Sequence, residues 1–199
     1  MNTDPTLEYY NENAVSFTEN TRDVDFSETR DRFLAQLPEG SRILDFGCGS
    51  GRDTKSFLMR GYQAEALDGS EELCRLAAAY TGIRVTCMRF QEFQEHCRYD
   101  GIWACASILH LPSRELAKVM HQLACALKDG GLLYVSFKYG TEEGVRNGRY
   151  FTDMTGEKLE EFLKEIPELC LCEQWVTSDV RPGRETERWL NVFLRKRQT

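Results

Sequence analysis

The sequence contains no long hydrophobic run, no excess of basic residues and no closely spaced cysteine pair, and each absence excludes a class of protein. Its most apolar stretch, residues 102–111, is far shorter than the roughly 20 residues that span a bilayer. The chain begins with polar and acidic residues, without the basic and apolar regions of a secretory signal. We therefore expect a cytoplasmic protein that has no contact with a membrane.

Eight cysteines are present, but none stands in a Cys-x-x-Cys pair. The usual signature of a zinc ribbon or a thioredoxin-like redox site is therefore missing. Many of these cysteines lie inside apolar runs, as reduced and buried thiols do in cytosolic proteins. No other group of residues has the spacing of metal ligands, so the sequence predicts no metal.

Acidic residues outnumber basic ones by 32 to 25, which gives a net charge of −7. Proteins that bind nucleic acid by neutralising phosphates usually have the opposite balance, so we do not expect a nucleic-acid partner. Residues 181–199 are the exception, with six basic and two acidic residues. A local contact with an anion or with RNA therefore stays open at this end of the chain.

Short apolar runs alternate with amphipathic stretches along the chain, with no repeats and no linker between them. Such alternation predicts right-handed βαβ crossovers and a mostly parallel sheet, here a Rossmann-like three-layer α/β sandwich of seven strands. The last two strands have no helix between them and should form an antiparallel pair at one edge. The expected strands are 42–46, 63–67, 84–87, 99–104, 132–137, 169–177 and 189–195, and the expected helices are 26–37, 54–60, 70–81, 113–127 and 155–166.

We expect the chain to divide into an N-terminal lid and helix, residues 1–39, and an α/β domain, residues 40–199. Aromatic residues at Tyr9, Tyr10 and Phe17 stand among polar ones in the first segment. This spacing favours a lid that folds over a ligand, with Tyr10 as a cofactor contact. The alternative is a helix that only packs on the domain.

The most informative segment is a glycine-rich turn after the first strand. The strand ends in Asp45 and runs into glycines at 47, 49 and 51. Glycines let the backbone turn tightly and approach a ligand closely, and this edge of the sheet is the expected ligand crevice. Arg52 stands where a dinucleotide fingerprint would have its last glycine. The loop therefore favours a nucleoside without phosphates, and Asp45 could attract an ammonium group.

A second acid, Asp68, lies 23 residues after Asp45, at the end of the second strand. A carboxylate at this position is placed to accept hydrogen bonds from both ribose hydroxyls. A nucleoside joined to an amino acid, without phosphate, describes S-adenosylmethionine. The alternative is a glycine-rich turn that binds nothing.

The segments 45–53 (DFGCGSGRD) and 99–110 (YDGIWACASILH) carry a family resemblance. Over roughly residues 40–195 the sequence resembles class I S-adenosylmethionine-dependent methyltransferases, and most closely the small tellurite-resistance-type methyltransferases. The resemblance implies a seventh strand that runs antiparallel between the fifth and sixth. It also implies cofactor contacts at Gly69 and Ser70, a contact of Ala104 near the sulfonium, and a backbone contact at Phe90. The acid that the class often has beside the adenine is absent from the segment at Phe90.

The methyl acceptor should lie above the fourth and fifth strands, where the sequence places Ser107, His110, Lys138 and Arg149. His110 is the candidate general base, since its ordinary pKa lies near neutrality. Alternatively it only hydrogen-bonds to the backbone of its loop. Ser107, Lys138 and Arg149 are candidate substrate contacts, the last two for an anionic acceptor. The alternative for both basic residues is a solvated loop with an internal ion pair.

Taken together, these features predict a methyltransferase that acts on a small molecule by in-line displacement. The alternatives are an RNA or protein methyltransferase, a catalytically silent S-adenosylmethionine-binding regulatory protein and, less favoured by the glycine spacing, a nicotinamide dehydrogenase. The sequence carries no signal for the oligomeric state or the acceptor atom.

Overall fold

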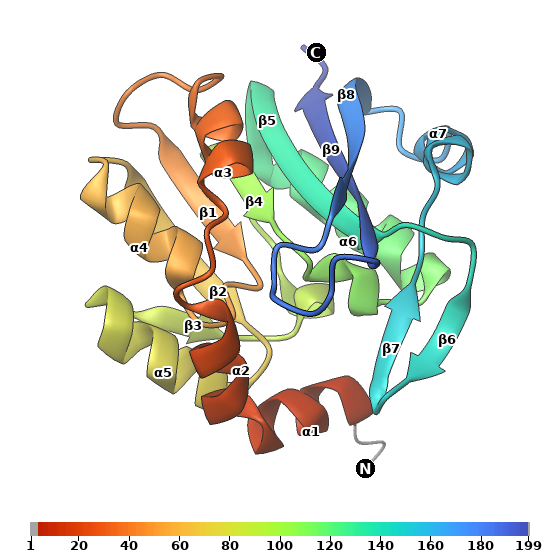
Figure 1. Ribbon diagram of the computed structural model, residues 1–199. Coiled ribbons are helices and arrows are strands. Elements are labelled where there is room, and N and C mark those ends of the chain that lie inside the picture. The colour runs from red at the N-terminus through yellow and green to blue at the C-terminus, as the bar shows by residue number, and fades with distance from the viewer. Residues whose placement is uncertain (1–3, 199) are drawn as a thin grey trace.

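A twisted sheet of seven strands forms the centre of the computed structural model, which describes residues 4–198 (Figure 1). The strand order is β3-β2-β1-β4-β5-β9-β8, and β9 runs antiparallel to both of its neighbours. This confirms the expected mostly parallel sheet with its last strand antiparallel between the fifth and sixth. The strands are β1 (Arg42–Phe46), β2 (Gln63–Asp68), β3 (Val85–Cys87), β4 (Tyr99–Ala104), β5 (Leu127–Lys138), β8 (Leu169–Ser178) and β9 (Arg188–Lys196).

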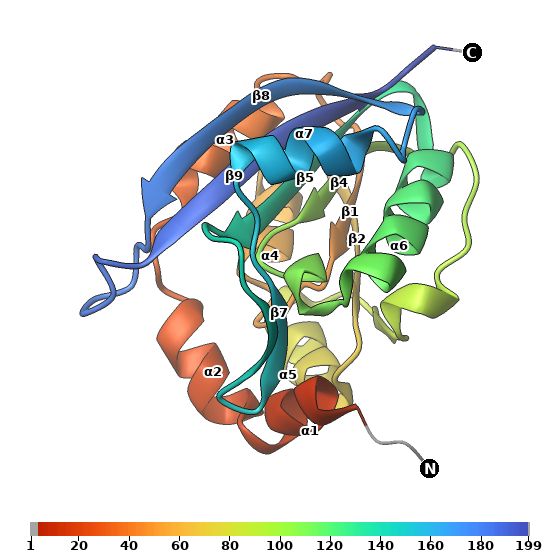
Figure 2. The ribbon, with the colours of Figure 1, turned by 90° about the vertical axis from the view of Figure 1, so that its right-hand side faces the viewer.

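Helices cover both faces of the sheet, which makes the three expected layers (Figures 1 and 2). One face carries α3 (Ser27–Leu34), α4 (Arg52–Met59) and α5 (Glu71–Thr81), and the other carries α6 (Ser113–Ala126) and α7 (Gly156–Leu163). Short 3-10 turns, η1 (Phe90–Glu92) and η2 (Ile108–His110), follow β3 and β4. Between residues 4 and 198, no helix has the length and apolar character needed to cross a bilayer.

The apolar core lies on both sides of the sheet. Leu116, Val119 and Met120 of α6 are fully buried, as their helical spacing requires. On the opposite face, Trp103 of β4 stacks on Tyr134 of β5 with ring centroids 4.0 Å apart. Burying each such apolar side chain contributes roughly 1.5–3 kcal/mol, so the sheet is a rigid platform for the loops at its edges.

The region after β5 differs from the loop that the sequence suggested. Strand β6 (Glu143–Arg146) pairs antiparallel with β7 (Arg149–Thr152) in a separate hairpin. Asn147 and Gly148 connect them, with φ of 50° and 76°. An Asn-Gly pair is the favoured two-residue turn of a β-hairpin because both positions need positive φ. The dipeptide was therefore a local signal for this hairpin, and it holds Arg149 at the start of β7.

The N-terminal helices α1 (Pro5–Glu12) and α2 (Ala14–Thr21) lie beside the carboxyl ends of the parallel strands, with α1 next to the β6–β7 hairpin (Figure 1). The Tyr150 amide donates to Thr6 Oγ1 at 3.0 Å, and the Ser70 hydroxyl bonds Asn11 Oδ1 at 2.7 Å. Helix α3 differs from them, because its Phe33 is fully buried against the sheet. The division of the chain at residue 40 stays a prediction.

Candidate functional site

A cavity opens at the carboxyl edge of the parallel strands, between the sheet, the N-terminal helices, the β6–β7 hairpin and the segment joining β8 to β9. Most of the residues that the sequence singled out line this cavity: Tyr10, Asp45, Gly47, Gly49, Asp68, Gly69, Phe90, Ser107, His110, Lys138 and Arg149. Tyr10 and Arg149, which are 139 positions apart in the chain, therefore contribute to one site.

Three predicted cofactor contacts do not line the cavity. Gly51 is the N-cap residue that precedes α4, with φ of 77°, and it faces Ala77 of α5. Ser70 is fully buried and caps α5 by accepting a hydrogen bond from the Leu73 amide. Ala104 is buried in the apolar core, and the next two residues, Cys105 and Ala106, line the cavity in its place.

The glycine-rich turn has no room for a side chain at Gly47. A Cβ at Gly47 would come within 2.4 Å of Ser107 Cβ and 2.9 Å of the Phe90 ring. The amides of Gly47 and Cys48 both donate to the Leu67 carbonyl, at 2.9 and 3.0 Å. The absence of a side chain thus lets the end of β1 lie directly against the residues that follow β4.

The Asp68 carboxylate accepts a hydrogen bond from the backbone of the glycine-rich turn. Its Oδ2 accepts from the Gly49 amide and its Oδ1 from the Ser70 amide, both at 2.9 Å. Burial raises the pKa of the carboxyl above its ordinary value, while these amides oppose that shift. Each carboxylate oxygen has a further lone pair to offer, so Asp68 can also accept from two neighbouring hydroxyls in the cavity.

Asp45 lies under the same turn, next to a second acid. Its Oδ2 accepts from the Thr54 hydroxyl at 2.5 Å. Burial and the nearby Asp53 raise the pKa of Asp45 to about 7. Although burial alone would raise the pKa of Asp53, Arg52 and Arg30 hold it below its ordinary value.

Arg52 is a lining residue to which the sequence assigned no contact. Its guanidinium donates to Asp53 Oδ2 at 2.7 Å and to Oδ1 at 3.0 Å. Trp103 Nε1 donates to Asp53 at 3.0 Å as well, which fixes the carboxylate. Because Arg52 directly follows the glycine-rich turn, its position in the sequence could have indicated that it lines the cavity.

Tyr10, His110 and Arg149 meet at the far end of the cavity. The Tyr10 hydroxyl lies 2.8 Å from His110 Nε2, and Arg149 donates to that hydroxyl at 3.4 Å. His110 Nδ1 lies 2.6 Å from the Tyr150 carbonyl oxygen, which can only accept, so Nδ1 carries the proton and Nε2 accepts from Tyr10. Burial lowers the pKa of His110 to about 4. A neutral imidazole bound at both nitrogens favours the backbone-bonding alternative over the general base.

Ser107 and Lys138 face the cavity but have partners of their own. The Ser107 hydroxyl donates to the Phe46 carbonyl at 2.6 Å, and Lys138 forms an ion pair with Glu187. The Ala106 amide donates to the Ser136 hydroxyl at 2.8 Å, with Ala106 in the left-handed region at φ of 50°. Such backbone strain is held by surrounding structure and is common at functional sites.

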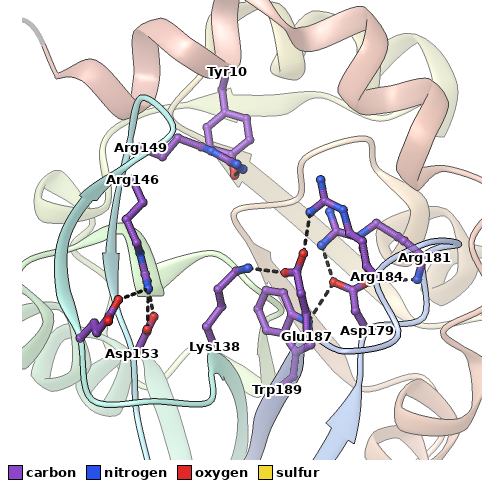
Figure 3. A network of polar contacts seen from close by, with 11 residues as sticks. Tyr10, Lys138, Arg146, Arg149, Asp153, Asp179, Arg181, Arg184, Glu187 and Trp189 are labelled. Atoms are coloured by element: carbon purple, nitrogen blue, oxygen red, sulfur yellow. Dashed lines mark hydrogen bonds and ion pairs between the residues drawn. The ribbon is translucent and has the colours of Figure 1, made fainter.

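The segment between β8 and β9 supplies a wall that the sequence did not predict (Figure 3). Asp179, Arg181 and Arg184 line the cavity from this segment, and Trp189 lines it from β9. Asp179 accepts from Arg181 and from Trp189 Nε1, the latter at 3.0 Å. In the part of the chain that the structure describes, no three His, Cys, Asp or Glu side chains are grouped so that they could hold a metal ion.

Comparison with known families identifies one match along most of the chain. A family model described as "Methyltransferase domain" matches residues 18–175. Among curated proteins, the ubiquinone biosynthesis O-methyltransferase of Xanthomonas axonopodis pv. citri (strain 306) is 29% identical over 107 residues. These residues make up 50% of this chain and 44% of that protein, so the chain spans less than half the length of this curated relative.

Solved structures share the fold at lower sequence identity. The 1,6-didemethyltoxoflavin-N1-methyltransferase of Burkholderia thailandensis, with bound 1,6-didemethyltoxoflavin and S-adenosylhomocysteine, matches with a TM-score of 0.76 and 20% identity over 96% of this chain and 85% of that one. The N-methyltransferase NodS of Bradyrhizobium japonicum WM9, in complex with S-adenosylhomocysteine, matches with a TM-score of 0.72 and 16% identity over 94% of this chain and 98% of that one. At these identities the likeness shows the fold, which confirms the expected architecture.

Proposed function

The chain belongs to the methyltransferase-domain family, and from this premise we propose that it transfers a methyl group from S-adenosylmethionine to a small-molecule acceptor. The observation that carries the proposal is Asp68, a buried carboxylate that holds the glycine-rich turn and faces the cavity. Asp45 and Asp53 flank the glycines and would repel a phosphate group. The finer resemblance to tellurite-resistance-type enzymes stays a hypothesis about the acceptor.

The residues around the turn fit each part of this cofactor. Asp68 would accept from the ribose hydroxyls, and the Phe90 ring, stacked on Phe46 with centroids 4.6 Å apart, would flank the adenine. Arg52 would bind the carboxylate of the amino-acid portion, and Asp45 its ammonium group. When bound, the cofactor supplies an activated methyl group on a sulfonium.

The chain's own residues orient the reactants and exclude water. Phe17 of α2 lies over Gly49, where a Cβ would be 3.0 Å from its ring, and Tyr10 of α1 closes the side nearer β4. Holding two reactants in line inside a closed site removes much of the entropic barrier to displacement. Since His110 is neutral and bonded at both nitrogens, we assign it to bracing Tyr10 and the β6–β7 hairpin.

A methyltransferase of RNA or protein would need a basic docking face, and the structure offers little at the basic end of the chain. Arg181 pairs with Asp179, and Arg184 lies 3.6 Å from Glu187. Arg195 donates to the Gly130 carbonyl at 2.9 Å. These side chains are engaged within the fold, which favours a small acceptor over a macromolecular one.

Calorimetric titration with S-adenosylhomocysteine tests the proposal. We expect binding with a micromolar dissociation constant, on the order of −8 kcal/mol. Methyl-labelled cofactor incubated with cell extract should then label small molecules and not RNA or protein. Binding without any labelling would indicate a silent binding protein, and the absence of binding would reject the proposal.

Replacing Asp68 with alanine should weaken binding of S-adenosylhomocysteine by about 1–3 kcal/mol, the usual cost of deleting one partner of a buried hydrogen bond. Because Asp68 also holds Gly49, the affinity alone does not isolate the ribose contact. An analogue lacking both ribose hydroxyls closes the double cycle. Wild type should bind this analogue more weakly than S-adenosylhomocysteine. The Asp68→Ala variant should bind the two ligands equally well. Equal losses in both proteins would place the ribose elsewhere.

A further inference from the structure

This inference rests on the proposed function and concerns the chemical class of the acceptor. Arg149 projects from the start of β7 into the cavity (Figure 3). Its nearest polar partner is the Tyr10 hydroxyl, at 3.4 Å, and its Nε is buried without any hydrogen bond. Among the described residues it forms no ion pair within 4.0 Å. A guanidinium has five donors in a planar fork, so most of the Arg149 donors are unused.

The other basic residues at this end of the cavity have acidic partners (Figure 3). Lys138 pairs with Glu187, which also lies 3.6 Å from Arg184. Arg181 is bound by Asp179. Arg146, the neighbour of Arg149 across the hairpin, is bound by Asp153. Within residues 4–198, Arg149 therefore has no acidic partner, whereas each of these neighbouring basic residues lies against a carboxylate.

Aromatic rings hold the Arg149 guanidinium in place. Its Cζ lies 4.4 Å from the centroid of the Tyr9 ring, 5.2 Å from that of Phe151 and 5.7 Å from that of Tyr10. Cation–π contacts of this kind orient a guanidinium without satisfying its hydrogen-bond donors. Phe151, Tyr10 and Trp189 also line the cavity, so a ligand that reaches Arg149 passes between flat apolar surfaces.

We propose that the acceptor carries a carboxylate that binds to Arg149, next to a planar unsaturated body that packs against Tyr10, Phe151 and Trp189. A carboxylate matches the guanidinium fork in two parallel hydrogen bonds and brings the single negative charge that Arg149 lacks. A phosphate would bring nearly two charges into a space that the Asp179 carboxylate also borders. The geometry therefore points to a monoanionic carboxylate.

The test uses simple probes on the full chain saturated with S-adenosylhomocysteine. Benzoate supplies a planar carboxylate, benzamide is its neutral counterpart, and inorganic phosphate is the competing anion. We expect benzoate to bind at least about tenfold more tightly than benzamide, from charge-assisted hydrogen bonds to Arg149. Phosphate should bind more weakly than benzoate. Titration calorimetry measures all three.

Two variants assign the preference to Arg149. R149Q should bring benzoate down to the affinity of benzamide, and R149K should give an intermediate value because it keeps the charge and loses the fork. R75Q removes one positive charge from an exposed site on α5 and should leave the preference unchanged. S-adenosylhomocysteine affinity should be the same in all four proteins.

Equal binding of benzoate and benzamide by wild type would overturn the inference, and so would a benzoate preference that survives in R149Q. Tighter binding of phosphate than of benzoate would overturn the carboxylate assignment. Failure of wild type to bind S-adenosylhomocysteine would instead reject the proposed function, so the two failures are distinguishable.

Discussion

Replacement of Gly49 by valine is expected to abolish binding of S-adenosylhomocysteine and to leave a folded protein. Gly49 has φ of 53°, and a Cβ there would stand 3.0 Å from the Phe17 ring. A β-branched residue in this conformation adds strain of about 1–2 kcal/mol and fills the space above Asp68. We expect the dissociation constant to rise more than about 100-fold, a loss of roughly 3 kcal/mol by calorimetry.

A matched control separates backbone strain from the blocked cavity. Gly61 has φ of 83° and open space around its Cβ, and it lies outside the cavity. Gly61→Val should therefore lower stability by a similar amount while cofactor affinity stays unchanged. Adding Phe17→Ala to Gly49→Val removes the ring that the new side chain meets. Affinity restored by this second change would show that the valine only displaces the lid, and normal binding by Gly49→Val alone would mean that this turn is not the cofactor cradle.

The glycine-rich turn could be predicted because its determinants are local. Gly47 and Gly49 have positive φ and follow a buried strand, and both requirements are visible within a few residues of sequence. Asp68 was predictable for a related reason: parallel strands bring their carboxyl ends to the same edge, so the end of β2 lies beside the end of β1.

The acceptor end of the cavity depends on contacts between distant segments. Tyr10 meets His110 across 100 positions of the chain and Arg149 across 139. The sequence predicted all three as site residues. No local pattern indicates that both ring nitrogens of His110 have hydrogen-bond partners. The structure, and not the sequence, is therefore what favours a bracing role for His110 over a general base.

The segment after β8 could not be predicted as part of the site. Arg181 and Arg184 lie in the basic stretch 181–199, for which the sequence left only a contact with an anion or with RNA open, and Asp179 carried no signal. They reach the cavity because β9 is inserted beside β5, which folds the β8–β9 connection over the carboxyl edge. This placement follows from sheet topology, and charge counting along the sequence does not reveal it.

Replacement of His110 by glutamine is expected to change how stability depends on pH. Burial lowers the pKa of His110 from 6.5 to about 4, so the unfolded chain binds the proton more readily than the folded one. The contribution of the neutral imidazole is therefore fully present above pH 6.5 and is lost as pH falls toward 4. The difference in unfolding free energy, wild type minus His110→Gln, should rise by about 3 kcal/mol between pH 4 and pH 7. Denaturant titrations at a series of pH values measure it.

The difference in unfolding free energy between wild type and His110→Gln cancels the pH dependence that Asp45 contributes, which has the opposite sign. The pKa of that carboxyl is raised to about 7, so its contribution is lost as pH rises, but it is common to both proteins. His121→Gln, at an exposed histidine on α6, gives the baseline for losing an imidazole elsewhere. A bracing His110 also requires that kcat falls in His110→Gln while its pH profile between 5 and 8 keeps its form. A difference in unfolding free energy that does not vary with pH would show that His110 is not held neutral, and a kcat profile flattened near neutrality would return it to the role of general base.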